Sequence, residues 1–272
     1  MTNDKDFTKS EQYTLSIRLS TDGFSFSIYN PPEGSDLYFR SYQVNTQQSM
    51  AANVKAFLAA TDEFKYKYKQ TNILIHTARY TPVPLVFFED DQSEMIFYQN
   101  LPKQNNEIIL CNILGKSNVV VLFSIDKLTH LLLSEHFPDA RFFSTVSPQI
   151  EYLSTLSKQT GNYKLYANLH SHSMDVLCFN KGCLQLVNTY TINSPEDRCY
   201  YLLNIWNRLQ YNQENDELHL IGLLDKKSEL IAELKKYIRC IFIINPQADF
   251  NESHASRIEY IPFDIQSLLL CE

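Results

Sequence analysis

Two stretches of equal length decide the fold: TLSIRLSTDGFSFSIYN, residues 14–30, and KLYANLHSHSMDVLCFN, residues 164–180. Each alternates apolar and polar residues, is interrupted by a polar turn, and alternates again, which is typical of two antiparallel strands joined as a hairpin. The first turn contains Asp22-Gly23, a dipeptide that favours hairpins because glycine readily adopts positive φ. In the second stretch His170-Ser171-His172-Ser173 stands at the turn. The two stretches therefore predict hairpins at corresponding places in the chain.

The same elements follow each hairpin in the same order. After the first hairpin the patterns predict a strand at 37–44, a helix capped by Asn45 or Thr46, and a short buried strand at 72–77. After the second they predict a strand at 184–192, a helix capped by Ser194, and strands at 217–222 and 238–244 around a further helix. Few residues are identical between the halves. The order of elements is what predicts an internal duplication.

The first half carries additional material at about 79–140. Its patterns predict a helix near 92–101, a hairpin formed by 107–114 and 118–123, and a helix at 125–136 with the apolar stripe Leu128, Leu131 and Leu132. A strand at 141–145 and a helix beginning at Ser147-Pro148 follow. The polar stretch SKQTGN, residues 157–162, is typical of a boundary. We therefore predict a first half at 1–160 with an inserted subdomain, and a second half at 161–272.

Composition excludes several classes of protein. The net charge is −7 and the Lys and Arg residues are scattered, so no basic patch indicates nucleic-acid binding. The longest apolar runs are far too short to span a bilayer, and the polar N-terminus does not resemble a secretory signal. The six cysteines form no CxxC pair. These features favour a soluble, cytoplasmic protein whose thiols are free.

Glycine is scarce, with six residues in 272, and every glycine is isolated. Loops that cradle phosphate need several glycines in a short span, because the backbone must approach the ligand closely. The chain therefore contains neither a P-loop nor a dinucleotide-binding fingerprint.

The layout of three strands, a helix, a strand and a helix, present twice, resembles the actin-like ATPase (ribonuclease H-like) fold. This resemblance implies an α/β protein of two βββαβα halves around a cleft. The opening stretch 14–30, the stretch 164–180 and the strand ELHLIG at 217–222 also resemble an uncharacterised Bacteroidetes family, domain of unknown function 3822. Similar folds include pilus-assembly proteins that act as scaffolds, ATPases and sugar kinases, so the fold alone does not determine function.

The resemblance also implies where a nucleotide would bind. Active relatives place a glycine-rich phosphate loop with a leading Asp at the first hairpin of each half, and a glycine pair after a later strand. Asp22, Gly23 and Gly222 occupy such positions here. The second hairpin has neither Asp nor Gly at its turn, and Gly222 stands alone. An ordinary tight turn is the competing interpretation of Asp22-Gly23.

Other groups that could carry chemistry have simpler interpretations. His170 and His172 could face the same way as metal ligands with Asp175 or Cys178 nearby, but a polar hairpin tip is favoured because a metal site needs three or four convergent ligands. The acidic cluster of residues 89–91 and Glu94 indicates a solvated loop and helix start rather than a cation site. No local motif indicates a catalytic nucleophile.

We expect a non-catalytic scaffold or protein-interaction protein with a degenerate nucleotide site. We expect no catalytic residue, metal or cofactor. We do expect a protein partner or self-association. The alternative is an ATP- and Mg²⁺-binding protein with weak ATPase activity, using Asp22, Gly23 and Gly222. The missing glycines favour the first hypothesis.

Overall fold

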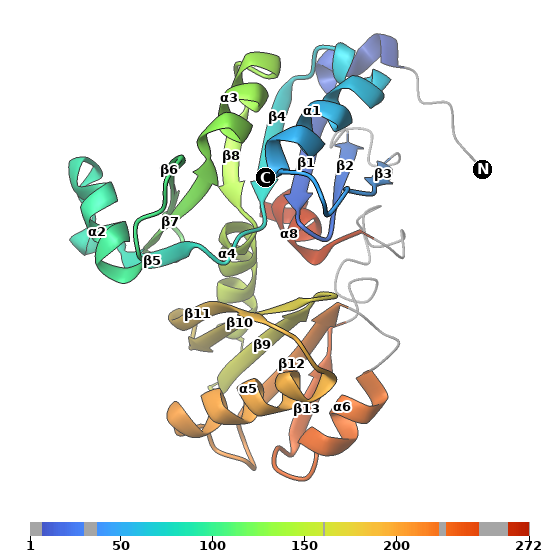
Figure 1. The fold of residues 1–272 in the computed structure, drawn as a ribbon. Helices are drawn as coiled ribbons and strands as arrows, with labels where there is room; N and C mark the ends of the chain where they lie inside the picture. Colours follow the sequence, from blue (N-terminus) through green and yellow to red (C-terminus); the bar gives the residue numbers. More distant parts are fainter. Residues whose placement is uncertain (1–6, 30–36, 160, 223–226, 245–260, 272) are drawn as a thin grey trace. The chain divides into compact units, whose positions relative to one another are not determined.

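The structure, a computed structural model, describes residues 7–29, 37–159, 161–222, 227–244 and 261–271. They form two compact units whose elements are labelled in Figure 1. The first unit holds the described residues up to Ile113 together with Asn118–Thr145. The second holds Leu114–Ser117 and most of the described residues from Val146 onward. Each unit contains a five-stranded sheet of its own.

The sheet of the first unit has the strand order β3-β2-β1-β4-β8. Its strands are β1 (Thr14–Ser20), β2 (Gly23–Tyr29), β3 (Tyr38–Tyr42), β4 (Gln70–Ile75) and β8 (Arg141–Ser144). β1 pairs antiparallel with β2 and parallel with β4, and β8 pairs parallel with β4. The first stretch is thus a hairpin at the centre of a mixed sheet, as predicted.

The sheet of the second unit has the order β11-β10-β9-β12-β13. Its strands are β9 (Tyr163–Leu169), β10 (Ser173–Asn180), β11 (Cys183–Thr191), β12 (Glu217–Gly222) and β13 (Cys240–Ile243). β9 pairs antiparallel with β10 and parallel with β12, and β13 pairs parallel with β12. Counted within each unit, both sheets run third, second, first, fourth, fifth. The predicted duplication of a βββαβ order is therefore present in three dimensions.

Helix α1 (Met50–Ala60) covers the apolar face of the first sheet. Its Phe57 ring lies 5.4 Å from that of Phe24 and 5.0 Å from that of Phe64. The predicted cap was wrong: Ser49 caps the helix, and its Oγ accepts the N–H of Ala52 at 3.2 Å. The backbone N–H of Asn45 donates instead to the side chain of Asn53 at 2.7 Å, so the chain before Ser49 forms a separate turn.

The inserted segment forms a small sheet of its own, in the order β5-β7-β6. Its elements are β5 (Tyr80–Pro84), the 3₁₀ turns Leu85–Phe87 and Asp90–Gln92, α2 (Ser93–Asn100), β6 (Glu107–Leu114) and β7 (Val119–Asp126). α2 packs on this sheet through Phe97, which is fully buried with Val120 and Leu122. The hairpin and the helix lie where the periodicity predicted them.

Helix α3 (Lys127–His136) follows the insert, but its buried face differs from the predicted stripe. Leu128 and Leu131 are 54% and 51% exposed, whereas Thr129 and Leu133 are buried. Asp126 caps the helix and accepts both the N–H and the hydroxyl of Thr129 at 2.8 Å. This cap orients Thr129 toward the protein, so the two leucines face outward.

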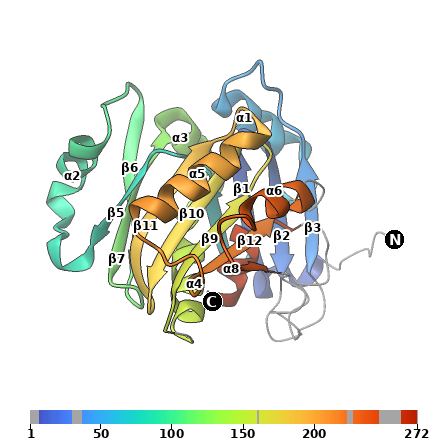
Figure 2. The same cartoon turned by 90° about the horizontal axis from the view of Figure 1, so that it is seen from below.

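In the second unit α5 (Pro195–Arg208) and α6 (Lys227–Leu234) lie across the same face of the sheet, as Figure 2 shows. Leu202 and Trp206 of α5 and Leu234 of α6 share a buried core with the apolar side chains of β9, β10 and β12. The start of α5 is as predicted, and Asp197 accepts the N–H of Ser194 at 3.0 Å. Helix α4 (Val146–Ser157) contacts β9, β10 and β11, and α8 (Phe263–Cys271) packs on α4.

The second compact unit already includes α4, because it resumes at Val146. The boundary between the halves predicted from the sequence lies later, between residues 160 and 161. A compact unit and a duplicated half need not share a boundary, so the predicted limits of the duplication stay a prediction.

Both faces of each central hairpin are buried, including the face that carries the polar residues of the alternating pattern. On β1 the polar residues Ser16, Arg18 and Ser20 are 0%, 7% and 1% exposed. On β9 and β10, Asn168 and Asp175 are 2% and 0% exposed. On the second hairpin Asn168 and Asp175 are hydrogen-bonded, as buried polar groups usually are, whereas the Oγ atoms of Ser16 and Ser27 on the first hairpin have no hydrogen-bond partner among the described residues. In the described part of the chain, no helix is long and apolar enough to cross a membrane.

Candidate functional site

The turn between β1 and β2 consists of Thr21 and Asp22, and both residues are exposed. The Asp22 N–H donates to the Oγ of Ser20 at 3.2 Å. Gly23 has φ +150°, and a Cβ there would lie 3.4 Å from the carbonyl oxygen of Tyr42. Asp22 and Gly23 are thus adjacent on a tight hairpin. Phosphate binding by a loop needs backbone N–H groups directed at the ligand, and here the N–H of Asp22 is already engaged.

The turn between β9 and β10 consists of His170, Ser171 and His172. The His170 N–H donates to the carbonyl of Ser173 at 3.0 Å, which closes the turn. Arg198, in the first part of α5, donates from Nη2 to the carbonyl oxygens of His170 and Ser171 at 2.8 and 3.3 Å. A charged donor binds carbonyl groups strongly, so Arg198 fixes this turn against α5.

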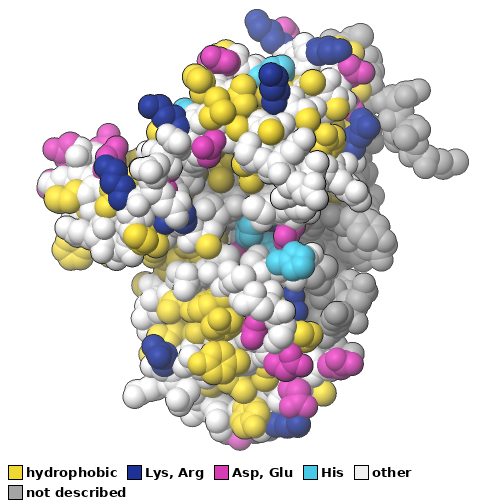
Figure 3. All heavy atoms as spheres, viewed as in Figure 1, with side chains coloured by type: hydrophobic (Ala, Val, Ile, Leu, Met, Phe, Trp, Pro, Cys, Tyr) yellow, Lys and Arg dark blue, Asp and Glu magenta, His cyan; other side chains and the backbone are white. Residues whose placement is uncertain are grey.

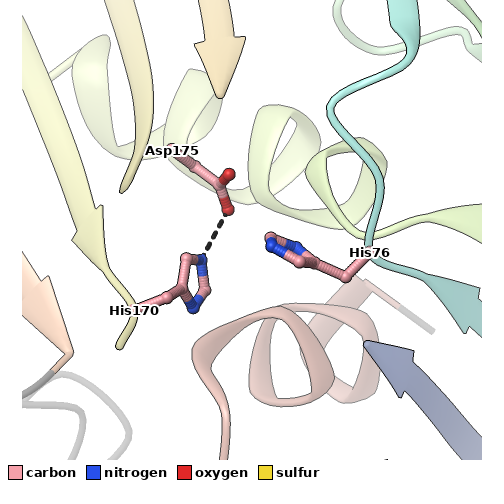
Figure 4. Close-up of side chains that lie close together, drawn as sticks. All are labelled: His76, His170 and Asp175. Atoms are coloured by element: carbon pink, nitrogen blue, oxygen red, sulfur yellow. Dashed lines mark hydrogen bonds and ion pairs between the residues drawn. The ribbon is translucent and has the colours of Figure 1, made fainter. Parts of the chain in front are cut away.

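A buried carboxylate lies beside this turn. His170 Nε2 is 2.8 Å from Oδ2 of Asp175, the pair joined by the dashed line in Figure 4. Thr189 Oγ1 donates to Oδ1 of Asp175 at 2.7 Å, and Gln149 Nε2 donates to Oδ2 at 3.4 Å. A carboxylate only accepts, so Nε2 of His170 carries the proton in this pair. Asp175 therefore orients the imidazole, as a carboxylate orients the histidine of a hydrolytic triad.

Gln149 links this carboxylate to the end of β12. Asn168 Nδ2 donates to Oε1 of Gln149 at 3.1 Å. Gly222 has φ +89°, and a Cβ there would lie 2.4 Å from the Leu169 carbonyl oxygen and 3.2 Å from Oδ1 of Asn168. The close approach of β12 to β9 thus requires glycine at 222 for a structural reason. Whether Asp22, Gly23 and Gly222 also hold a nucleotide stays a prediction.

Three further candidates from the sequence are His172 and Cys178, which belong to the second unit, and His76, which belongs to the first. His172 is exposed at the tip of the turn. Cys178 lies in the apolar core on the α5 side of the sheet, where burial raises its pKa to about 12. His76 follows β4 in the first unit, with its backbone N–H on the Leu19 carbonyl at 2.9 Å and Nδ1 3.2 Å from Oγ1 of Thr145. Of the two residues that the sequence allowed near His170, Asp175 is its hydrogen-bond partner, and Cys178 lies in the apolar core instead.

Sequence reasoning missed three residues of this network: Gln149, Thr189 and Arg198. They come from α4, β11 and α5 and meet only after the sheet has formed. One signal was available for Arg198. The capping pattern at Ser194 predicts a helix start, which places Arg198 one turn into α5, close to the end of a strand.

A second buried polar cluster lies at the opposite end of the same sheet. His219 Nε2 is 2.8 Å from Oε2 of Glu217, and Lys164 Nζ is 3.5 Å from the same oxygen. The His219 ring stacks between Tyr166 and Phe242, with centroid distances of 4.8 and 5.0 Å. Burial lowers the pKa of His219 despite the carboxylate beside it. Burial favours the neutral form of Glu217, but His219 and Lys164 bring its pKa below the usual value.

Comparison with known proteins identifies a family. The profile of DUF3822, described as a protein of unknown function, matches residues 2–241. A crystal structure from Bacteroides thetaiotaomicron, described as a protein with an actin-like ATPase fold and unknown function, superimposes with a TM-score of 0.89. It is 46% identical, and the alignment covers 99% of this chain and 100% of that one.

A more distant structure has the same fold. The PilM-PilN type IV pilus biogenesis complex gives a TM-score of 0.55 at 11% identity, with 90% of this chain and 92% of that chain covered. At this identity the match shows the fold alone. No curated protein matches the chain.

Proposed function

This chain belongs to the DUF3822 family and has the actin-like ATPase fold, and from that premise we propose that it is a non-catalytic interaction protein with a degenerate nucleotide site. The observation that carries the proposal is the hydrogen bonding of the second hairpin turn. Arg198 engages two carbonyl groups of that turn, and His170 is held by Asp175. A phosphate loop would need N–H groups and glycines at this place.

The first turn supports the same conclusion. It has two residues between the strands, and the Asp22 N–H is engaged by Ser20. Neither turn thus offers the row of backbone donors with which this fold class holds phosphate. Gly222 is accounted for by its close approach to Leu169.

Partner binding is the role that remains for a fold without its phosphate loops. One protein of this fold, PilM, forms a complex with PilN, so the architecture is compatible with a scaffold role. We expect this chain to bind a protein partner or a second copy of itself. We place it in the cytoplasm because all six cysteines are free thiols, among them the exposed Cys183.

The alternative is a protein that binds Mg-ATP and hydrolyses it weakly. Asp22 favours it, since the carboxylate is exposed on the turn where the resemblance expects an acid that organises Mg²⁺. The two hypotheses predict opposite results for thermal unfolding in the presence of Mg-ATP.

The test is thermal unfolding with 5 mM MgCl₂ alone and with about 5 mM Mg-ATP. A nucleotide present at a hundred times its dissociation constant adds about 2.7 kcal/mol to the free energy of unfolding, which moves the midpoint by several degrees. We expect no shift. A shift in the native chain that Asp22→Asn abolishes would establish the alternative. Glu135→Gln, an exposed acid on α3, is the control for loss of one negative charge.

A further inference from the structure

The inserted subdomain carries a pocket at the edge of its sheet. The pocket has a volume of about 410 Å³ and is lined by Asp90, Asp91, Ser93, Glu94, Ile109, Leu110 and Cys111. Three consecutive residues of β6 contribute to it. Successive side chains of a strand point to opposite faces of the sheet, so the pocket follows the edge of β6 itself.

Among the described residues β6 is an edge strand, with β7 as its one strand neighbour. It reads EIILCNIL over Glu107–Leu114, a long apolar strand. Such an edge presents unpaired backbone groups and tends to pair with another chain, and proteins usually shorten it, charge it or cover it. β6 carries one charged residue, Glu107, and that carboxylate is occupied by Arg79 at 2.7 Å. The strand is therefore suited to accept a further strand.

The strand is also held in place from its other face. Asn112 donates from Nδ2 to the carbonyl of Phe142 at 2.8 Å, and its Oδ1 accepts the N–H of Ser144 at 2.9 Å. The carboxamide thus occupies the free edge of β8 and anchors β6 to the first sheet. A rigid edge lowers the ordering cost when a flexible segment binds to it.

Exposed apolar side chains gather at one end of this small sheet. Pro84 pairs with Val119, so the end of β5 and the start of β7 coincide there, and the β6–β7 hairpin brings the end of β6 to the same place. Exposed residues at this end are Val86, Phe87 and Ile113, at 82%, 72% and 61%. Ile113 continues the row of Ile109 and Cys111 beyond the small core under α2.

The opposite wall of the pocket is acidic. Glu89, Asp90, Asp91 and Glu94 are all exposed, and Figure 3 shows acidic side chains gathered over the α2 region beside hydrophobic ones. Residues 80–126 contain six acids and two lysines. Burial raises the pKa of the Cys111 thiol and the Asp90 carboxylate adds to the increase, which places Asp90 close to β6. A ligand in this pocket therefore meets an apolar strand on one side and negative charge on the other.

We propose that the edge of β6 binds an extended segment of a partner protein by strand addition, with aliphatic side chains along β6 and Lys or Arg side chains toward Asp90, Asp91 and Glu94. Main-chain hydrogen bonds supply affinity in this mode, and alternate side chains supply specificity. The charge complementarity selects a basic partner and disfavours acidic segments and anionic lipid surfaces. This inference rests on the proposed role as an interaction protein and specifies its surface.

The probe is a library of random nonapeptides displayed on phage and selected on the full-length chain. We expect enriched peptides to alternate aliphatic residues with Lys or Arg. An enriched peptide, labelled with fluorescein, should bind Asp90→Asn/Asp91→Asn/Glu94→Gln about tenfold more weakly, because three rim ion pairs are lost. The charge-matched control Glu135→Gln/Asp139→Asn/Glu229→Gln removes three exposed acids elsewhere and should leave affinity unchanged.

Strand addition has a signature that a purely electrostatic contact lacks. N-methylation of alternate peptide residues should abolish binding in one register and spare it in the other, since only every second N–H faces β6. The amides of Ile109–Cys111 should also exchange more slowly with peptide bound. An absence of enrichment, equal affinity for both triple variants, or equal effects of both methylation registers would overturn the inference.

Two further outcomes separate this inference from its premises. A concentration-dependent dimer that the Asp90/Asp91/Glu94 variant loses would make a second copy of the chain the occupant, and would overturn the assignment to a partner. A thermal shift with Mg-ATP in a chain that still binds the peptide would overturn the proposed function and leave the β6 surface intact.

Discussion

The Nε2 atom of His170 lies 2.8 Å from Oδ2 of Asp175, and the Asp175 carboxylate is fully buried. His170 is the first residue of the β9–β10 turn, and Asp175 lies five positions later in β10. Thr189 and Gln149 also donate to this carboxylate. The Asp175 carboxylate therefore links the turn, β11 and α4 in a single polar network. Its removal should lower the stability of the whole second unit.

Asp175→Asn should lower the free energy of unfolding by about 3 kcal/mol, because the amide keeps the volume but presents N–H groups to donors and leaves them unpaired. Trp206 reports on the folding of this unit, because it is the one tryptophan of the chain and lies on α5 in the core against the sheet. Urea unfolding followed by Trp206 fluorescence measures the change. The control Glu229→Gln, an exposed acid in α6, should change it by less than about 0.5 kcal/mol. Equal effects would mean that Asp175 contributes no more than a surface charge.

Gly222→Ala should destabilise the second unit by about 3 kcal/mol or more. Residue 222 has φ +89°, and the added Cβ would lie 2.4 Å from a backbone oxygen, so strain and steric conflict add. Gly161→Ala is the matched control, because a Cβ there meets nothing within 4 Å. A tolerated Gly222→Ala, measured by the same Trp206 unfolding curves, would show that the glycine is not required by the backbone.

Stability should fall as the pH decreases below about 6.5. Burial lowers the pKa of His219, so the folded state favours the neutral ring and the unfolded chain binds more protons below the usual value of 6.5. The contribution of His219 is therefore fully present above pH 6.5 and is lost on acidification, with a slope of up to about 1.4 kcal/mol per pH unit. Glu217, whose pKa is lowered, loses its contribution only at more acidic pH.

Unfolding curves between pH 7.5 and 5.5 measure this dependence. His219→Gln should flatten it. His130→Gln removes a histidine whose pKa is also lowered by burial, but it lies in the first unit and should leave the Trp206 signal unchanged. An unaltered pH slope in His219→Gln would assign the dependence to another group.

Arg198→Met should loosen the second turn without unfolding the unit. The guanidinium holds two carbonyl groups of the turn, and charge-assisted bonds of this kind contribute about 1.5–3 kcal/mol each in favourable sites. The His170 amide should therefore exchange at least about tenfold faster with deuterium. Arg208→Met, which removes an exposed bond to Asn204, is the control. Unchanged exchange at His170 would show that the turn is rigid by itself.

The hairpins, the order of elements and the insert could be read from local patterns. Tyr13–Ser20 alternates strictly, and Asp22-Gly23 favours one kind of turn, so β1 and β2 needed no tertiary information. The same holds for α5, whose start at Ser194-Pro195 has specific capping chemistry. The predictions for the cap of α1 and for the buried face of α3 were wrong. The Asn45–Asn53 bond forms a separate turn before Ser49, and Asp126 holds Thr129 toward the protein, and neither contact can be read from periodicity.

Local sequence patterns were enough to predict two matched βββαβ halves, an insert within the first half, and the scarcity of glycine that argues against phosphate loops. These properties depend on residues close in the chain. Three features needed the three-dimensional structure: the burial of the polar side chains of β1, β9 and β10, the sharing of Asp175 by His170, Thr189 and Gln149, and the position of β6 at an acidic edge. Burial and long-range pairing are set by elements distant in sequence, and periodicity along a single strand carries no information about them.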